Sequence, residues 1–172
     1  MSGAWERPAL KNENLRLEKV DVYNFDELYD LAVTLPQQAF VATNRYSMAE
    51  AYATISSGRF VQAFGIYDGD MAVGFAMIGH RSENYEGMPE ARKNGYTLWR
   101  LMIDQRFQRL GYGREALALL LSFVLSAPDG EEDTWTVSCE ETNEAAWKLF
   151  RSFGFVPNGE TDGEETVLVY KL

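Results

Sequence analysis

Residues 98–126 read LWRLMIDQRFQRLGYGREALALLLSFVLS, and three patterns follow one another within them. The first part, as far as Asp104, is apolar and has the length of a β-strand. A polar, basic segment with Gly111 and Gly113 comes next, and an apolar run then predicts a helix from about Gly113 to Ser126. The first N–H groups of a helix have no partner within the helix and lie at the positive end of its dipole. Because the glycines also let the backbone approach an oxyanion closely, we expect this loop to hold a pyrophosphate.

The glycine loop differs from two common phosphate-binding motifs. A Walker loop requires Gly-Lys-Ser/Thr, which is missing here. A dinucleotide fingerprint requires three glycines near the first strand of a βαβ unit, whereas this loop has two and lies past mid-chain. Residues 108–113 instead fit Gln-x-x-Gly-x-Gly, a pattern that an ordinary glycine-bearing turn could also produce. Three arginines add positive charge: Arg106, Arg109 and Arg114.

Length and composition bound the kind of protein. The 172 residues suit one domain, which we place at 15–172 after a lead-in at 1–14. The formal net charge of −10 disfavours nucleic acid and anionic membranes as partners and favours cationic small molecules, although solubility alone could explain it. No signal peptide or membrane span is visible, no metal site is indicated, and a single cysteine fits a reducing compartment. A cytoplasmic location is expected.

Hydrophobic periodicity and turn residues predict an α/β fold, a mixed sheet with helices on both faces. The second helix is expected to begin with a capping box, Ser47 to Glu50, and to bury Met48, Ala51, Tyr52 and Ile55. The predicted elements are a strand over 15–20, a helix over 24–35 ended by Pro36, a helix over 47–58, a hairpin of strands 60–67 and 71–79, a loop over 81–95, the strand–loop–helix unit, a strand over 134–139, a helix over 143–153, a strand that begins at 155–156, a turn at 161–164 and a final strand over 166–172.

A second motif lies about thirty residues after the glycine loop. Residues 143–155 read NEAAWKLFRSFGF, that is, Asn-x-x-Ala, an aromatic residue and then Gly-Phe; Asn143 alone could be a plain helix cap. The two motifs in this order resemble the GCN5-related N-acetyltransferases, and the likeness covers residues 15–172. The resemblance implies a mostly antiparallel sheet of six to seven strands with a splayed cofactor cleft.

The resemblance also implies acetyl-CoA as cofactor and assigns residues to it. Main-chain groups of the central strand would pair with the pantetheine, and the edge at Met102 and Ile103 would stabilise the oxyanion. The implied cofactor residues are Leu101, Met102, Ile103, Gln108, Arg109, Leu110, Gly111, Tyr112, Gly113, Arg114, Asn143, Ala146 and Phe150.

The chain departs from the family pattern at the groups that handle protons. Phe150 stands where many relatives have a tyrosine that protonates the leaving thiolate, and Arg100 stands where some have a carboxylate base. We expect Arg100, between Leu98 and Met102 on one strand face, to pair with a buried acid. Glu140 is our candidate terminus for a water chain that takes the amine's proton, with a plain solvent-exposed carboxylate as the alternative. Cys139 is interpreted as core and His80 as structural, with an acetyl-carrying nucleophile and an acid or base as the alternatives.

The acceptor is suggested by residues 38–51, which resemble the loop between the first two helices of bacterial spermine/spermidine acetyltransferases. A polyamine needs carboxylates and aromatic faces along a groove. We therefore expect direct acetyl transfer to a primary amine in a possible homodimer; a protein N-terminus or amino-sugar as acceptor, or a weakly catalytic CoA sensor, are the alternatives. The candidate acceptor residues are Phe40, Tyr46, Glu50, Glu83 and Tyr85.

Overall fold

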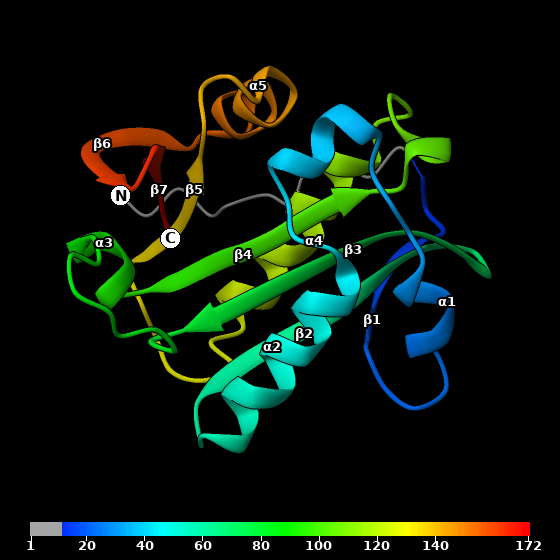
Figure 1. The fold of residues 1–172 in the computed structure, drawn as a ribbon, viewed down its shortest axis with the longest axis horizontal. Coiled ribbons are helices and arrows are strands. Elements are labelled where there is room, and N and C mark those ends of the chain that lie inside the picture. The colour runs from blue at the N-terminus through cyan, green and yellow to red at the C-terminus, as the bar shows by residue number, and fades with distance from the viewer. Residues whose placement is uncertain (1–11) are drawn as a thin grey trace.

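A computed structural model describes residues 12–172, and its centre is one sheet of seven strands in the order β1-β2-β3-β4-β5-β7-β6 (Figure 1). Among the strands of residues 12–172 only the neighbours β4 and β5 run parallel, which confirms the predicted mixed, mostly antiparallel sheet. The strands are β1 Leu15–Lys19, β2 Phe60–Asp68, β3 Met71–His80, β4 Tyr96–Ile103, β5 Thr134–Cys139, β6 Val156–Asp162 and β7 Glu165–Lys171.

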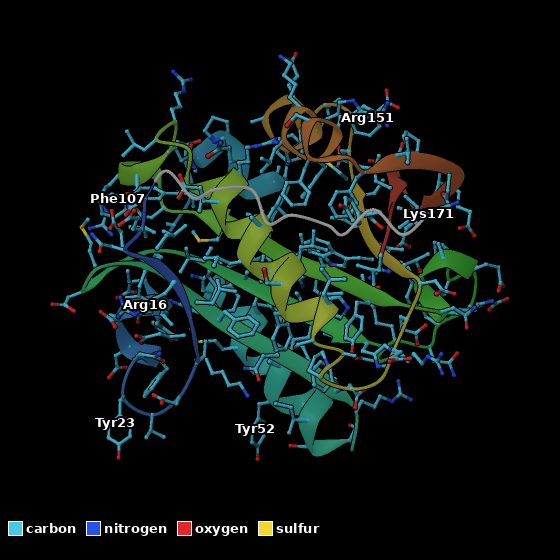
Figure 2. All side chains as sticks on the ribbon, turned by 180° about the vertical axis from the view of Figure 1, so that it is seen from behind. Arg16, Tyr23, Tyr52, Phe107, Arg151 and Lys171 are labelled. Carbon is cyan, nitrogen blue, oxygen red and sulfur yellow. The ribbon has the colours of Figure 1, made fainter. Side chains whose placement is uncertain are left out.

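Helices cover both faces of this sheet. The helices are α1 Phe25–Tyr29, α2 Asn44–Ser56, α3 Glu90–Lys93, α4 Tyr112–Leu125 and α5 Glu144–Phe153, with 3-10 helices η1 Leu35–Ala39 and η2 Gln105–Phe107. Helices α1 and α2 lie on the face nearer the viewer in Figure 1, and α4 crosses the opposite face, seen from behind in Figure 2. Each face has its own apolar cluster, the larger one beneath α4 and α5. Among residues 12–172 there is no helix with both the length and the apolar character to cross a membrane.

Strands β4 and β5 separate soon after they meet. Their pairing covers only residues 96–98 of β4 against 135–137 of β5. Just beyond it the register of β4 against β3 shifts, so that Met77 lies opposite Arg100 while Ile78 lies opposite Leu98. The extra residue is Trp99, and an extra residue in one strand bends that strand and increases its twist. The bulge therefore accompanies an opening between the two central strands, which is the expected splayed cleft.

The same bulge corrects the predicted face of Arg100. Simple alternation places Leu98, Arg100 and Met102 on one face, but Leu98 belongs to the cluster beneath α4 and Met102 to the cluster beneath α2. One additional residue reverses the alternation of all side chains that follow it. Arg100 consequently faces α2, whereas Leu101 packs against the α4 cluster.

The helix predicted over residues 24–35 is too long. Helix α1 ends at Tyr29, and Pro36 lies at the start of the 3-10 helix η1 instead of ending a helix. The reason is a long-range contact: the Ala32 N–H donates to the Asp104 carboxylate at 3.0 Å, and the Ala32 carbonyl accepts from the Gln105 N–H at 2.9 Å. Both backbone groups of Ala32 are thus bound to the segment after β4, which prevents the helix from continuing through it.

Helix α2 begins three residues before the predicted capping box. Thr43 is its N-cap and accepts from the Tyr46 N–H at 3.2 Å, while Ser47 is fully buried in the second turn. The buried face is more polar than predicted, because the Asn44 amide donates to the Leu28 carbonyl at 2.8 Å. Tyr52 and Ile55, predicted to be buried, are 76% and 58% exposed. The predicted loop over 81–95 also contains the short helix α3.

Candidate active site

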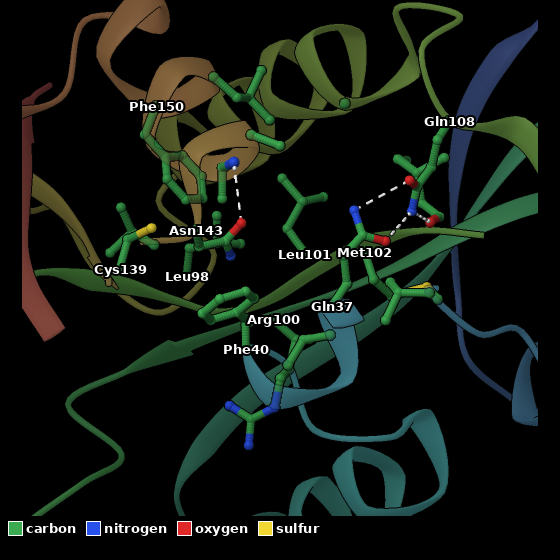
Figure 3. Close-up of a pocket in the computed structure, with 18 of the residues that line it drawn as sticks. Gln37, Phe40, Leu98, Arg100, Leu101, Met102, Gln108, Cys139, Asn143 and Phe150 are labelled. Carbon is green, nitrogen blue, oxygen red and sulfur yellow. Dashed lines mark hydrogen bonds between the residues drawn. The ribbon is translucent and has the colours of Figure 1, made fainter. Parts of the chain in front are cut away.

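A cavity of about 550 Å³ lies where β4 and β5 diverge (Figure 3). Its walls come from the splayed ends of both strands, the glycine loop with the start of α4, helix α5, and the segment around η1. Of the expected cofactor residues, all but Leu110, which is 64% exposed, line the cavity. Of the expected acceptor residues Phe40 lines it, whereas Tyr46, Glu50, Glu83 and Tyr85 do not; Glu140 does.

The glycine loop forms one end of the cavity. Gly111 is the N-cap of α4 with φ of +93°, a conformation that glycine adopts without strain. The backbone bonds of α4 begin with the Arg114 and Glu115 N–H groups, which donate to the Gly111 carbonyl at 3.2 and 3.3 Å. The N–H groups of Tyr112 and Gly113 precede these bonds and lie at the positive end of the helix dipole. This geometry fits a pyrophosphate.

Side chains hold the loop in place. Gln108 donates through Nε2 to the Ile103 carbonyl at 3.0 Å and exchanges hydrogen bonds with the Gln37 amide (Figure 3). Arg106 donates to the Asp104 carboxylate at 2.7 Å and is not part of the cavity wall, and Arg114 donates to the Ser152 carbonyl at 3.2 Å. Arg106 and Arg114 therefore stabilise the loop through hydrogen bonds to other groups of the protein, in addition to the positive charge that they contribute.

The exposed edge of β4 forms one wall of the cavity. The Asp104 N–H donates to the Val73 carbonyl in β3 at 2.9 Å. Successive residues of a strand direct their backbone groups to opposite sides, so the N–H and C=O of the preceding residue, Ile103, point away from β3. By the same alternation, the N–H and C=O of Leu101 also point away from β3, whereas the N–H of Met102 points toward Phe75 in β3. This corrects the expected role of Met102: the backbone donors on the cavity side belong to Leu101 and Ile103.

Helix α5 closes the inner end of the cavity. Asn143 caps it as predicted, with Oδ1 accepting from the Ala146 N–H at 3.4 Å. Phe150 is 5% exposed, packs edge-on against Phe155 at 5.7 Å between ring centroids, and extends toward Leu98 (Figure 3). Burial, reinforced by nearby carboxylates, raises the pKa of the Cys139 thiol to about 12. A thiol that stays protonated at neutral pH favours the core interpretation of Cys139.

Arg100 has the acidic partner predicted for it. Its guanidinium donates to the Glu50 carboxylate at 2.8 Å and to the Ser47 hydroxyl at 3.2 Å, which joins β4 to α2. Both members of the ion pair are half-buried. Glu50 is thereby held next to the cavity through Arg100, which itself lines the wall.

A second charged group lies near the cavity and was not predicted. Arg92 of α3 donates to the carboxylates of Glu83 and Asp162, and Asp162 also accepts from the Tyr85 hydroxyl at 2.7 Å. Glu83 and Tyr85, expected to contact the acceptor directly, are therefore tied to this arginine and to β6. Arg92 and Glu165 line the cavity. No local motif could reveal the group, since its members come from α3, the loop after β3, and the β6–β7 hairpin.

His80 lies in a network of its own. Its Nδ1 is 2.8 Å from an Asp129 carboxylate oxygen and its Nε2 is 2.7 Å from a Glu132 oxygen, and its ring stacks on Tyr96 at 4.5 Å. The side chain is buried and forms no part of the cavity wall. These contacts fasten the turn before β5 to the end of β3, which agrees with the structural interpretation.

Comparison with known proteins agrees with the fold and the cavity. Residues 25–155 match the acetyltransferase (GNAT) family. Over 163 residues the chain is 30% identical to the spermine/spermidine N(1)-acetyltransferase of Bacillus subtilis (strain 168), covering 92% of this chain and 99% of that protein. The fold is similar to spermidine N-acetyltransferase from Vibrio cholerae in complex with CoA and spermine, with a TM-score of 0.66, 14% identity, and coverage of 94% and 96%.

A second solved structure with this fold is the aminoglycoside acetyltransferase AAC(6')-Ib in complex with coenzyme A. Its TM-score is 0.72 at 13% identity, with coverage of 91% of this chain and 94% of that one. At such identities the structural likeness concerns the fold alone. The family match and the curated relative show more: the chain belongs to the GNAT acetyltransferase family and is an acetyl-CoA-dependent N-acetyltransferase.

Proposed function

We propose that the protein transfers the acetyl group of acetyl-CoA directly to a primary amine of a polyamine such as spermidine or spermine. The observation that carries the proposal is the chemistry of the cavity wall. Besides the N–H groups at the start of α4, the wall contains the carboxylate residues Glu140 and Glu165 and the aromatic residues Phe40 and Trp99. Ammonium groups joined by methylenes complement carboxylates and aromatic faces. The relative from B. subtilis is named for the same substrates.

We assign roles to the residues that line the cavity as part of this proposal. Acetyl-CoA supplies the thioester when bound. The glycine loop from Gln108 to Arg114 holds the pyrophosphate, and the cavity-side backbone groups of Leu101 and Ile103 bind the pantetheine. The Leu101 N–H, which points away from β3, would stabilise the negative charge that develops on the acetyl oxygen, and such a donor is worth about 10²- to 10³-fold in kcat. Asn143, Ala146 and Phe150 enclose the thiol end. The cytoplasmic location and the homodimer stay predictions.

The experiment that tests the function is a thiol-release assay with acetyl-CoA against polyamines, amino-sugars and short peptides. Turnover should be highest with spermidine or spermine, since the net charge of −10 and the carboxylates at the cavity favour an elongated cation. Higher turnover with a peptide or an amino-sugar would show that this compound, and not a polyamine, is the acceptor. CoA binding without turnover on any amine would favour the sensor alternative, for which the phenylalanine at position 150 is the supporting feature.

Phe150→Tyr is expected to leave folding intact and to raise kcat by up to about tenfold. The ring lines the cavity, so the added hydroxyl can reach the thiol end and donate a proton to the departing thiolate. Phe155→Tyr is the matched control: this ring is 1% exposed and outside the cavity wall, so its hydroxyl is buried without a partner at a cost of about 1–3 kcal/mol. Melting curves and steady-state kinetics measure both. Equal destabilisation by the two variants would show that Phe150 has no access to the cavity.

A further inference from the structure

We propose that Glu165 is the proton acceptor for the acceptor amine, an inference that rests on the proposed acetyl transfer to a primary amine. Glu165 begins β7 and is half-buried in the wall of the cavity. The last paired residues of β5 and β7 are Cys139 and Thr166, so Glu165 lies one step beyond them, opposite Glu140. On this face it is followed by Val167, which pairs with Ser138. Glu165 is thus on the same side of the sheet as Ser138, facing away from the core side of β5.

The charges around Glu165 leave its carboxylate uncompensated. Arg92 is engaged by Glu83 and Asp162, and Arg100 is engaged by Glu50. Among the hydrogen bonds and ion pairs of residues 12–172, none involves the Glu165 carboxylate; its backbone is paired in the β6–β7 hairpin. It also lies directly opposite Asp162 in the β6–β7 hairpin, and like charges in such a pair repel each other. A carboxylate in this position favours an ammonium group as its partner.

Within residues 12–172, two buried polar atoms in this part of the cavity lack the hydrogen-bond partner that a polar ligand could supply. The Ser138 hydroxyl and the Arg92 Nε are buried without a hydrogen-bond partner among the residues the structure describes, and both residues line the cavity. The Arg92 side chain is only 10% exposed. Buried polar groups are almost always satisfied, by protein, water or ligand. A reacting amine with an ordered water at this face would supply the missing partners.

The surroundings also suit Glu165 for accepting a proton. Burial raises its pKa, and the nearby Asp162 and Glu140 carboxylates raise it further, while Arg92 and Arg100 act in the opposite direction. A carboxylate with a raised pKa is a stronger base. It acts in the charged form, so activity is present above this pKa and is lost as the pH falls through it. The titratable and charged groups near Glu165 are Asp162, Glu140, Arg92 and Arg100 on its own side of the sheet, and the Cys139 thiol on the core side.

The proton step balances without any further reactant. A primary ammonium has a pKa near ~10, so it must lose a proton before its nitrogen can attack. The Glu165 carboxylate takes this proton, directly or through one water, and the nitrogen lone pair forms a bond to the thioester carbon. The carbon–sulfur bond then breaks, and the second proton lost by the nitrogen goes to the sulfur. Glu165 returns its proton to solvent, so each turnover releases one proton.

The test compares Glu165→Gln with wild type in pH profiles of kcat/KM, using whichever amine of the panel wild type acetylates fastest. Wild type should show a plateau between the pKa of Glu165 and that of the amine. At neutral pH the kcat/KM of Glu165→Gln should be lower than that of wild type by on the order of 10²-fold. Its profile should have no plateau, because kcat/KM should rise tenfold per pH unit as the fraction of free amine increases. CoA affinity, measured by calorimetry, should stay unchanged. If Glu165 had only a structural role, Glu165→Gln would lower kcat/KM by the same factor at every pH and would keep the plateau.

Two other variants complete the experiment. Glu164→Gln removes the exposed carboxylate next to Glu165 and should reproduce the wild-type profile. Glu140→Gln removes the rival base and should keep the plateau. A plateau retained by Glu165→Gln, or lost by Glu140→Gln alone, overturns the assignment. If the fastest amine is not a polyamine, the substrate proposal fails while the profile still decides the role of Glu165; no turnover with any amine overturns both.

Discussion

Gly111→Val is expected to weaken CoA binding by at least about 100-fold while the protein stays folded. A valine at φ of +93° is strained, at about 1–3 kcal/mol, and the loop relieves this strain by moving its N–H groups away from the phosphate site. The side chain itself has room, because an added Cβ would lie 4.0 Å from its nearest neighbour, the Glu115 Oε1. Calorimetric titration with CoA measures the binding, and melting of the unliganded protein measures the fold.

Gly159→Val is the matched control for this prediction. Gly159 lies in β6 with φ of +90° and nothing within 4 Å of an added Cβ, so it carries comparable backbone strain far from the glycine loop. The two variants should lose similar stability, and only Gly111→Val should lose CoA. Unchanged CoA affinity in Gly111→Val would mean that the pyrophosphate is held elsewhere.

The parts of the site that the sequence predicts correctly are those encoded by neighbouring residues. The glycine at the start of α4 and the Asn143 cap of α5 each depend on the conformation of a few consecutive residues. Their residue types therefore reveal them directly. The order of strands and helices is also local in this sense, because each follows from its own hydrophobic period.

The parts that the sequence does not predict depend on contacts between distant segments. The bulge at Trp99 arises from pairing with β3, and it changes which face Arg100 occupies. The early end of α1 depends on Asp104, more than seventy residues away from Ala32 in the chain. The group around Arg92 combines Glu83 with Asp162, which lie in separate elements. The hydrophobic periodicity of the sequence contains no information about contacts between distant segments. At these positions the tertiary contacts override the local structural preference.

Asp104→Ala is expected to lower the free energy of unfolding at pH 7 by on the order of 3 kcal/mol, or roughly 6–12 °C in Tm. The Asp104 carboxylate is buried and accepts from the Ala32 N–H at 3.0 Å and from the Arg106 N–H and Nε at 3.0 and 2.7 Å. Alanine leaves these donors without their acceptor and removes one of the two hydrogen bonds that join Ala32 to the segment after β4. Asp70→Ala, at an exposed aspartate in the β2–β3 turn, should change stability by less than about 0.5 kcal/mol.

The pH dependence of the stability lost in Asp104→Ala tests whether the charged carboxylate is the cause of that loss. Burial alone would raise the pKa of Asp104, but the hydrogen bonds from Arg106 and Ala32 outweigh burial and hold it below the usual value. A carboxyl group whose pKa is lower in the folded state stabilises the protein above its unfolded pKa of about 3.9, and this stabilisation disappears as the pH falls through the folded value. The gap between wild type and Asp104→Ala in urea unfolding should therefore be full at pH 7 and narrow progressively below about pH 5. A gap that stays constant over this range would assign the loss to packing, because removal of the side-chain atoms is independent of pH whereas the charge-assisted bonds are not.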